Sequence, residues 1–101
     1  MNNIERLASY ISESNFELDD TVLQETRYGR IIYFNFRDLI NDFGRCSLSL
    51  QSSLLTSFVI NRFDFKNGTT ITNKSKLKEL FKIMYLKIVS EGIGGKQQWR
   101  V

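Results

Sequence analysis

Asp64 and Lys66, in the stretch Phe-Asp-Phe-Lys, are the residues of this chain whose types and spacing best suit chemistry. Residues two apart on a β-strand point to the same face, so a strand here would present a carboxylate beside an ammonium group. A carboxylate can hold Mg²⁺, and a lysine can stabilise negative charge on a phosphate group. The pair therefore indicates metal-assisted phosphodiester hydrolysis as one chemistry to weigh.

An upstream carboxylate, from Asp38 or Asp42, and a glutamate from a helix could complete such a site. With them, the arrangement is similar to the core of restriction-endonuclease-like nucleases, and this resemblance implies a Mg²⁺-dependent nuclease. The resemblance covers only the Asp-x-Lys pair, and Asn67-Gly68 follows at once. Asn-Gly favours a tight hairpin turn, so the pair would lie at a strand tip, where charged side chains are ordinarily solvated. We therefore rank a nuclease third among three candidate functions and expect no hydrolysis of nucleic acid.

The chain lacks the side chains on which most other mechanisms depend. It contains no histidine and a single cysteine, Cys46. These counts exclude Ser-His-Asp and Cys-His catalysis, histidine general bases and zinc sites rich in cysteine or histidine. We expect a protein that is not an enzyme and that needs no catalytic residue, metal ion or cofactor.

A second stretch, residues 27–38, combines arginines with aromatic residues. Alternation along a strand over residues 31–36 places Arg27, Tyr33 and Arg37 on one face, where they could stack on bases and contact phosphates. Antiparallel sheets often keep one solvated face, so an ordinary half-buried strand explains this pattern better. Direct nucleic-acid binding, weak and salt-sensitive, is therefore our second function. The opposite face of the strand is uniformly apolar and should pack on a helix: Ile32, Phe34 and Phe36.

The helix that we expect from Asn73 or Ser75 to Glu91, ended by Gly92, is apolar on two sides. One strip can cover a sheet and consists of Leu77, Leu80, Phe81, Met84 and Ile88. The second strip lies roughly opposite and consists of Ile83, Leu86 and Val89. This second strip is either covered within the chain or bound by a partner, because contiguous exposed apolar area usually marks an interaction site.

Lysines and a C-terminal tryptophan accompany the second strip. Lys74, Lys78 and Lys82 recur along the helix and would form a polar rim beside the strip. Trp99 follows a pair of glycines, and it could either fold back on the core or act as a binding hot spot. The predicted partner-binding residues are Ile83, Leu86, Val89, Trp99, Lys78 and Lys82, and a homodimer is one form that this binding could take.

The order of elements predicts an α+β fold, with one domain over residues 1–91 and a glycine-rich tail over 92–101. An N-terminal helix capped by Asn2 or Asn3 is expected from the helical spacing of apolar residues up to Ile11. Extended patterns over residues 22–26, 31–36, 46–51 and 54–65, with residues 59–66 paired to a return at 69–72, predict one antiparallel sheet of four to five strands. Residues 38–45 are expected to form a connection, and the C-terminal helix should pack on the sheet.

Length, composition and charge bound the class of protein. A chain of 101 residues with 42% hydrophobic residues is long enough for one globular domain. The net charge of +3 is spread along the sequence, which permits an acidic partner without requiring one. Because no apolar run approaches the roughly 20 residues of a membrane span and the N-terminus lacks a secretory pattern, we expect a cytoplasmic protein without a membrane partner.

These observations favour a small binding protein that docks on a protein or nucleoprotein partner. Inhibitors, adaptors and accessory proteins, including those of mobile elements and of nucleic-acid-handling machinery, are roles that suit such a chain. The sequence identifies neither the partner nor the pathway.

Overall fold

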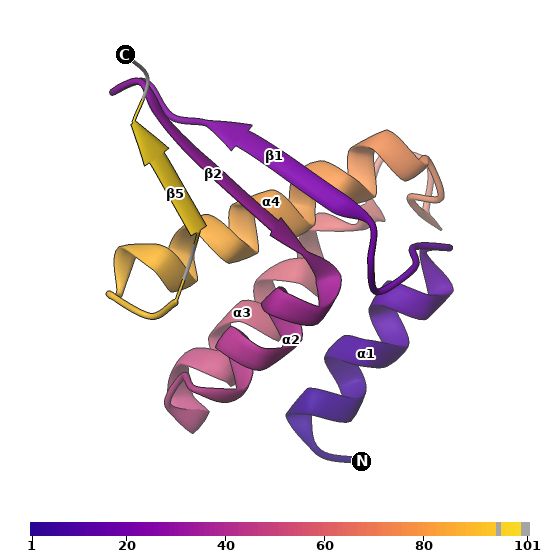
Figure 1. Ribbon diagram of the computed structural model, residues 1–101. Coiled ribbons are helices and arrows are strands. Elements are labelled where there is room, and N and C mark those ends of the chain that lie inside the picture. Colours follow the sequence, from indigo (N-terminus) through magenta and orange to yellow (C-terminus); the bar gives the residue numbers. More distant parts are fainter. Residues whose placement is uncertain (95, 100–101) are drawn as a thin grey trace.

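The computed structural model describes residues 1–94 and the backbone of residues 96–99, which form four helices and five strands (Figure 1). In chain order these are α1 (Asn3–Glu13), β1 (Thr21–Glu25), β2 (Arg30–Asn35), α2 (Phe36–Gly44), α3 (Leu48–Asn61), β3 (Phe63–Asp64), β4 (Thr69–Thr70), α4 (Lys74–Ser90) and β5 (Lys96–Trp99). The fold is α+β, as predicted. The N-terminal and C-terminal helices also lie where the sequence places them.

Each helix begins at a side-chain cap provided by an asparagine or a serine. The caps are Asn2, Asn35, Ser47 and Asn73, and each accepts a hydrogen bond from the backbone N–H three residues further on. At α2 the cap is reciprocal, because the Asp38 side chain accepts in return from the backbone N–H of Asn35 at 3.1 Å. These bonds satisfy N–H groups that have no partner within a first turn.

The C-terminus of α4 is closed by a Schellman motif. The N–H of Gly92 donates to the carbonyl of Val89 at 2.9 Å, and the N–H of Ile93 donates to the carbonyl of Ile88 at 3.4 Å. The motif needs a left-handed residue after the cap, and Gly92 supplies it with a φ of +79°. This confirms Gly92 as the residue that ends the helix. At the end of α1 the same position is held by Asn15, with a φ of +62°.

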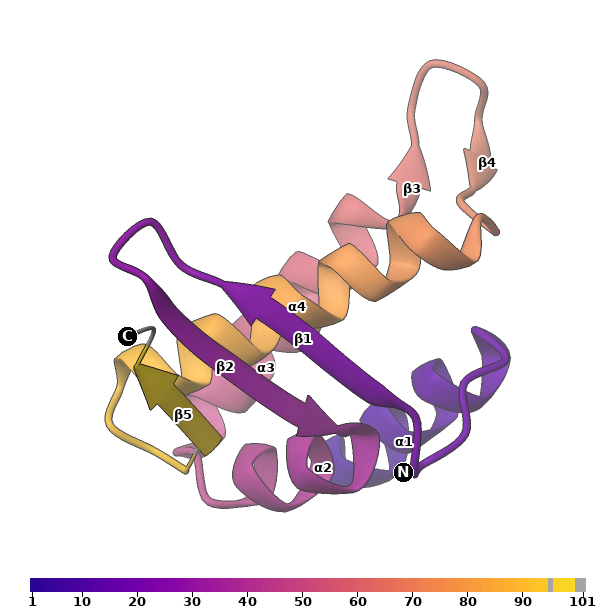
Figure 2. The same cartoon turned by 45° about the horizontal axis from the view of Figure 1, so that its top comes forward.

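The strands fall into two separate sheets, so the prediction of one sheet of four to five strands is wrong. β1, β2 and β5 form an antiparallel sheet with β2 in the middle. A turn joins β1 to β2, and Gly29 in this turn has a φ of +77°. β3 and β4 form a two-stranded ribbon that projects beyond the ends of α3 and α4 (Figure 2).

Two segments predicted as non-helical are helices. The expected connection over residues 38–45 lies mostly in α2, and the extended patterns over 46–51 and 54–65 lie mostly in α3. The buried residues of α3 include Gln51, Leu54, Leu55 and Phe58, whose spacing of three and four is that of a helix face rather than of a strand. Burial against neighbouring elements therefore outweighs the β-propensity of the branched and aromatic residues in this segment.

The core is a cluster of aromatic rings between the helices and the inner face of the sheet. Phe81 of α4 lies at its centre, stacked on Phe58 at 4.6 Å between centroids and edge-on to Phe36 at 5.2 Å. Phe34 of β2 stacks on Tyr85 at 4.1 Å and so fastens the sheet to α4. Within the described residues, no helix is both long and apolar enough to cross a membrane.

Candidate functional site

The three residues of the predicted apolar strip on α4 do not form one exposed surface. Ile83 is 58% exposed, whereas Leu86 and Val89 are half-buried and packed against the core. Lys82 forms an ion pair with Glu79 at 2.9 Å. Ile83 is thus the member of the strip that a partner can reach. The side chain of Trp99 is outside the part of the chain that the structure describes, although the backbone of Trp99 pairs with Arg30 in the sheet.

Ile83 lies on the wall of an apolar groove between α3 and α4. The groove has a volume of about 290 Å³ and is lined by six apolar side chains: Leu50, Leu54, Phe58, Leu80, Ile83 and Met84. Polar groups from Ser53, Ser57 and Asn61 of α3 and from Lys87 of α4 complete the lining. The groove was not predicted, because one of its two walls was expected to be a strand.

The α3 wall of the groove carries no charge. None of the 14 residues of α3 is Asp, Glu, Lys or Arg, although a quarter of all residues in the chain are charged. The solvent-facing residues of α3 are mostly serine and threonine, with Leu48 and Ile60 exposed near its two ends. Depletion of charged residues is one feature that the centre of a protein interface shares with this wall.

The three residues predicted to bind nucleic acid are spread along β2 and the segments on either side of it. Arg27 is in the turn before β2, where its guanidinium donates to the Tyr28 hydroxyl at 2.6 Å. Arg37 is in the first turn of α2 and forms an ion pair with Asp19 at 3.3 Å. Tyr33 lies between them on the outer face of the sheet, opposite Leu23 of β1. The structure does not gather the three into one surface.

The carboxylates of the nuclease-like arrangement are also apart. Asp64 ends β3, whereas Lys66 follows in the loop, so the two are not on one strand face. Asp38 completes the capping box of α2, and Asp42 accepts a hydrogen bond from the Tyr85 hydroxyl at 2.5 Å and pairs with Arg45 at 3.7 Å. Among the described residues, no three Asp, Glu, His or Cys side chains form a group that could hold a metal ion.

Cys46 is buried at the junction of α2 and α3. Burial raises the pKa of its thiol above the ordinary value, and the negative charges of Asp42 and Glu91 act in the same direction. The thiol donates to the carbonyl of Asp42 at 3.4 Å. A protonated, buried thiol of this kind is a poor nucleophile, so the structure gives Cys46 a packing role.

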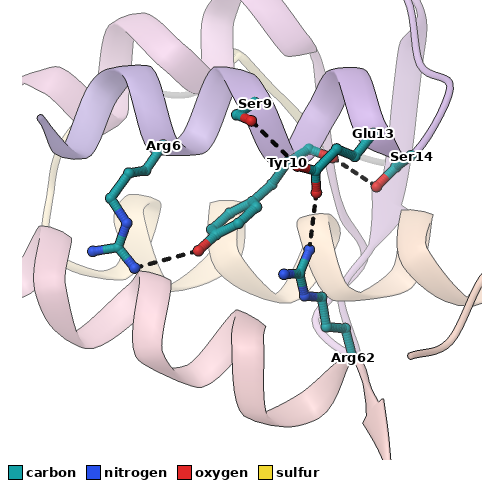
Figure 3. A network of polar contacts seen from close by, with 6 residues as sticks. All are labelled: Arg6, Ser9, Tyr10, Glu13, Ser14 and Arg62. Atoms are coloured by element: carbon teal, nitrogen blue, oxygen red, sulfur yellow. Dashed lines mark hydrogen bonds and ion pairs between the residues drawn. The ribbon is translucent and has the colours of Figure 1, made fainter. Parts of the chain in front are cut away.

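A polar network joins the C-terminus of α3 to α1 (Figure 3). The Arg62 guanidinium pairs with the Glu13 carboxylate at 3.4 Å and lies 4.5 Å from the centre of the Tyr10 ring. Glu13 also accepts from the Ser9 hydroxyl, and the Tyr10 hydroxyl accepts from Arg6, both at 3.3 Å. The network fixes α3 against α1 and keeps the Arg62 charge within the fold.

Comparison of the chain with known protein families, curated proteins and solved structures found no match. The assignment of a function therefore depends on the surfaces themselves. The α3–α4 groove combines six apolar side chains with a wall free of charge.

Proposed function

We propose that this chain is a binding protein without catalytic activity, and that it holds a protein partner through the groove between α3 and α4. The observation that carries the proposal is the pairing of six apolar groove residues with a charge-free α3. Ile83, on the α4 wall, is more than half exposed, so a partner that covered it would remove apolar surface from water. An inhibitor, an adaptor or an accessory protein would work in this way.

The size and shape of the groove favour a protein segment over a small molecule. Its volume of about 290 Å³ is at the lower limit of pockets that enclose drug-sized ligands, which are roughly 300–1,000 Å³. It runs between two packed helices, as do grooves that accept the apolar face of an amphipathic helix. We infer that the partner presents a helix with apolar residues spaced three and four apart.

The rim of the groove indicates what should flank that apolar face. Ser53, Ser57 and Asn61 offer hydroxyl and amide groups along α3, and Lys87 offers a positive charge on α4. Lys87 pairs at the exposed surface with Glu91 at 3.2 Å, an ion pair that a partner carboxylate could replace at little cost. Polar residues on one side of the partner helix and an acidic residue on the other would match this rim.

Replacement of Ile83 by glutamate tests the proposal. Because Ile83 is exposed, the variant should fold as the wild type does, and a charge in the groove should weaken partner binding at least tenfold. The matched control is Leu23→Glu, since Leu23 is 56% exposed on the outer face of the sheet, away from the groove. Affinity capture from the native host with the three proteins, quantified by mass spectrometry, should identify a protein lost with Ile83→Glu and retained with Leu23→Glu.

The captured candidate must then bind purified protein directly, and titration calorimetry should reproduce the difference between the two variants. Enrichment that is the same for all three proteins would contradict the groove as the binding site. Size-exclusion chromatography with light scattering on the same samples shows whether the partner is a second copy of this chain.

A further inference from the structure

The β3–β4 ribbon lies at one end of the molecule (Figure 2) and carries two exposed aromatic residues, Phe63 and Phe65. Phe65 is 74% exposed and Phe63 is 38% exposed, and their rings meet edge to face with centroids 4.8 Å apart. Each strand of the ribbon has only two residues, and both rings lie beside Val59 and Ile60 near the end of α3. Most of the Phe65 side chain is therefore exposed to solvent, and burial in the fold stabilises it little.

Positive charge is concentrated in the same part of the chain. Residues 62–78 hold five lysines and arginines and one aspartate, a net charge of +4, whereas the whole chain carries +3. The rest of the molecule is therefore slightly acidic. A second basic stretch, residues 27–37, carries +3 from Arg27, Arg30 and Arg37, so the ribbon with the start of α4 is one of two stretches rich in positive charge.

Most of these cations have no anionic partner. Lys66, Lys74, Lys76 and Lys78 form no ion pair with any residue that the structure describes, whereas Arg62 is held by Glu13 (Figure 3). Lys76 lines a shallow depression together with both ribbon phenylalanines. An unpaired ammonium group beside two exposed rings is the combination that binds an anionic, aromatic ligand.

The one carboxylate in this depression is already engaged. Asp64 accepts hydrogen bonds from the backbone N–H groups of Lys66 and Asn67, at 3.0 and 3.2 Å, and from the Asn67 side chain at 2.7 Å. Asp64 therefore shapes the loop and forms no ion pair with any described lysine, and the net charge of +4 for residues 62–78 already includes its negative charge. The surface as a whole stays positive.

We propose that this surface, formed by Phe63, Phe65, Lys66 and Lys76, binds single-stranded nucleic acid. Unpaired bases present flat faces that can stack on the phenylalanine rings, while the phosphates between them meet the lysines. In a duplex the base faces are stacked on one another, so only the terminal base pairs could stack on these rings. The site shares no residue with the α3–α4 groove and does not depend on the function proposed for that groove.

Fluorescence anisotropy with a labelled single-stranded oligonucleotide, and with a hairpin duplex of the same length, tests the proposal. Single strands should bind more tightly than the duplex, and three to four phosphate contacts should give a slope of log K against log salt of roughly −2 to −3. Phe65→Ala should weaken single-strand binding by about fivefold to one-hundredfold, the loss expected when one stacked base is released.

Tyr28→Ala is the matched control, because Tyr28 is a 70% exposed aromatic residue beside Arg27 at the tip of the other hairpin. It should leave binding unchanged. A second variant, Lys66→Gln with Lys76→Gln, should weaken binding and flatten the salt slope by about 1.4, while circular dichroism remains that of the wild type.

Several results would overturn the proposal. They are the absence of single-strand binding at low salt, equal binding of strand and duplex, and a Phe65→Ala variant that binds as well as Tyr28→Ala does. Sedimentation with vesicles of anionic phospholipid is run in parallel. Vesicle binding that requires Phe65, without oligonucleotide binding, would assign the surface to membranes instead.

Discussion

At the scale of single residues, Asp64 shows how local hydrogen bonds can decide the role of a charged side chain. Its carboxylate accepts three hydrogen bonds within its own loop, and the bonds from Asn67 have the largest effect in lowering its pKa below the usual value. Bonds of this kind stabilise the ionised form. The ionised carboxylate therefore stabilises the turn, and Asp64 has a structural role.

The pKa of Asp64 gives a pH-dependence with a definite sign. Because the folded-state pKa is below the unfolded value, the loop is stabilised fully above about pH 4 and loses this contribution as pH falls through the folded pKa. Carboxyl-carbon NMR should show Asp64 titrating below the usual aspartate range. Asn67→Ala removes the largest cause and should raise the midpoint towards pH 4. A wild-type midpoint at or above pH 4 would refute this account.

At the scale of elements, the sequence predicted the segments that are bounded by clear capping or turn residues. It did not predict the segments whose residue pattern fits both a helix and a strand. Asn73 and Gly92 mark the two ends of α4, and a turn that contains Gly29 separates β1 from β2. The sequence alone was therefore enough to identify α4, β1 and β2. The start of α2 carried a signal too, since Asn35 and Asp38 have the spacing of a capping box. That signal was hidden because Phe36 also continues the alternation of β2.

α3 was missed for a different physical reason. Its apolar residues occur on several sides, so neither a helical nor a strand period dominates the segment. Cys46, Leu48 and Leu50 do alternate, but Ser47 caps the helix between them. Only the packing of Leu54, Leu55 and Phe58 into the core selects the helix, and this packing depends on elements far away in the chain.

The end of α4 offers a direct test of the element-scale argument. Gly92→Ala places a side chain on a residue with a φ of +79° and should lower the free energy of unfolding by about 1–2 kcal/mol. The matched substitution is Gly44→Ala at the last residue of α2, where only the flexible Ile4 side chain lies near the new methyl group, at 3.3 Å. Gly44→Ala should be neutral or stabilising by up to about 1 kcal/mol. Urea denaturation of both variants measures the difference, and equal effects would contradict the role of the left-handed residue.

At the scale of the whole molecule, α4 packs against α2, α3 and β1. Its core side faces Phe34 and Phe36 through Tyr85 and Phe81, and its groove side faces α3 through Ile83. The sequence predicted the core side of α4 and singled out Ile83. It could not predict the groove, since the groove exists only where α4 meets a helix that was expected to be a strand.

Replacement of Phe81 should lower the stability of the whole molecule. It is fully buried and contacts the rings of Phe16, Phe36 and Phe58. Phe81→Ala should therefore cost about 3–5 kcal/mol, which could unfold so small a domain. Chemical denaturation followed by circular dichroism measures the loss. Phe65→Ala is the control and should cost less than about 0.5 kcal/mol, because Phe65 is exposed; similar losses would refute the assignment of the core.

The ribbon turn also bears on how the protein ages chemically. In an Asn-Gly sequence the glycine nitrogen can attack the asparagine side-chain carbonyl and expel ammonia, and water then opens the succinimide to aspartate or isoaspartate. Here the N–H of Gly68 donates to the carbonyl of Asp64 at 2.7 Å, and the Asn67 amide is held by the carboxylate of the same residue. The folded turn thus restrains both reacting groups and slows its own deamidation. Where the turn opens, each deamidation adds a negative charge to the most basic part of the molecule, so old protein should differ from fresh protein first at this end.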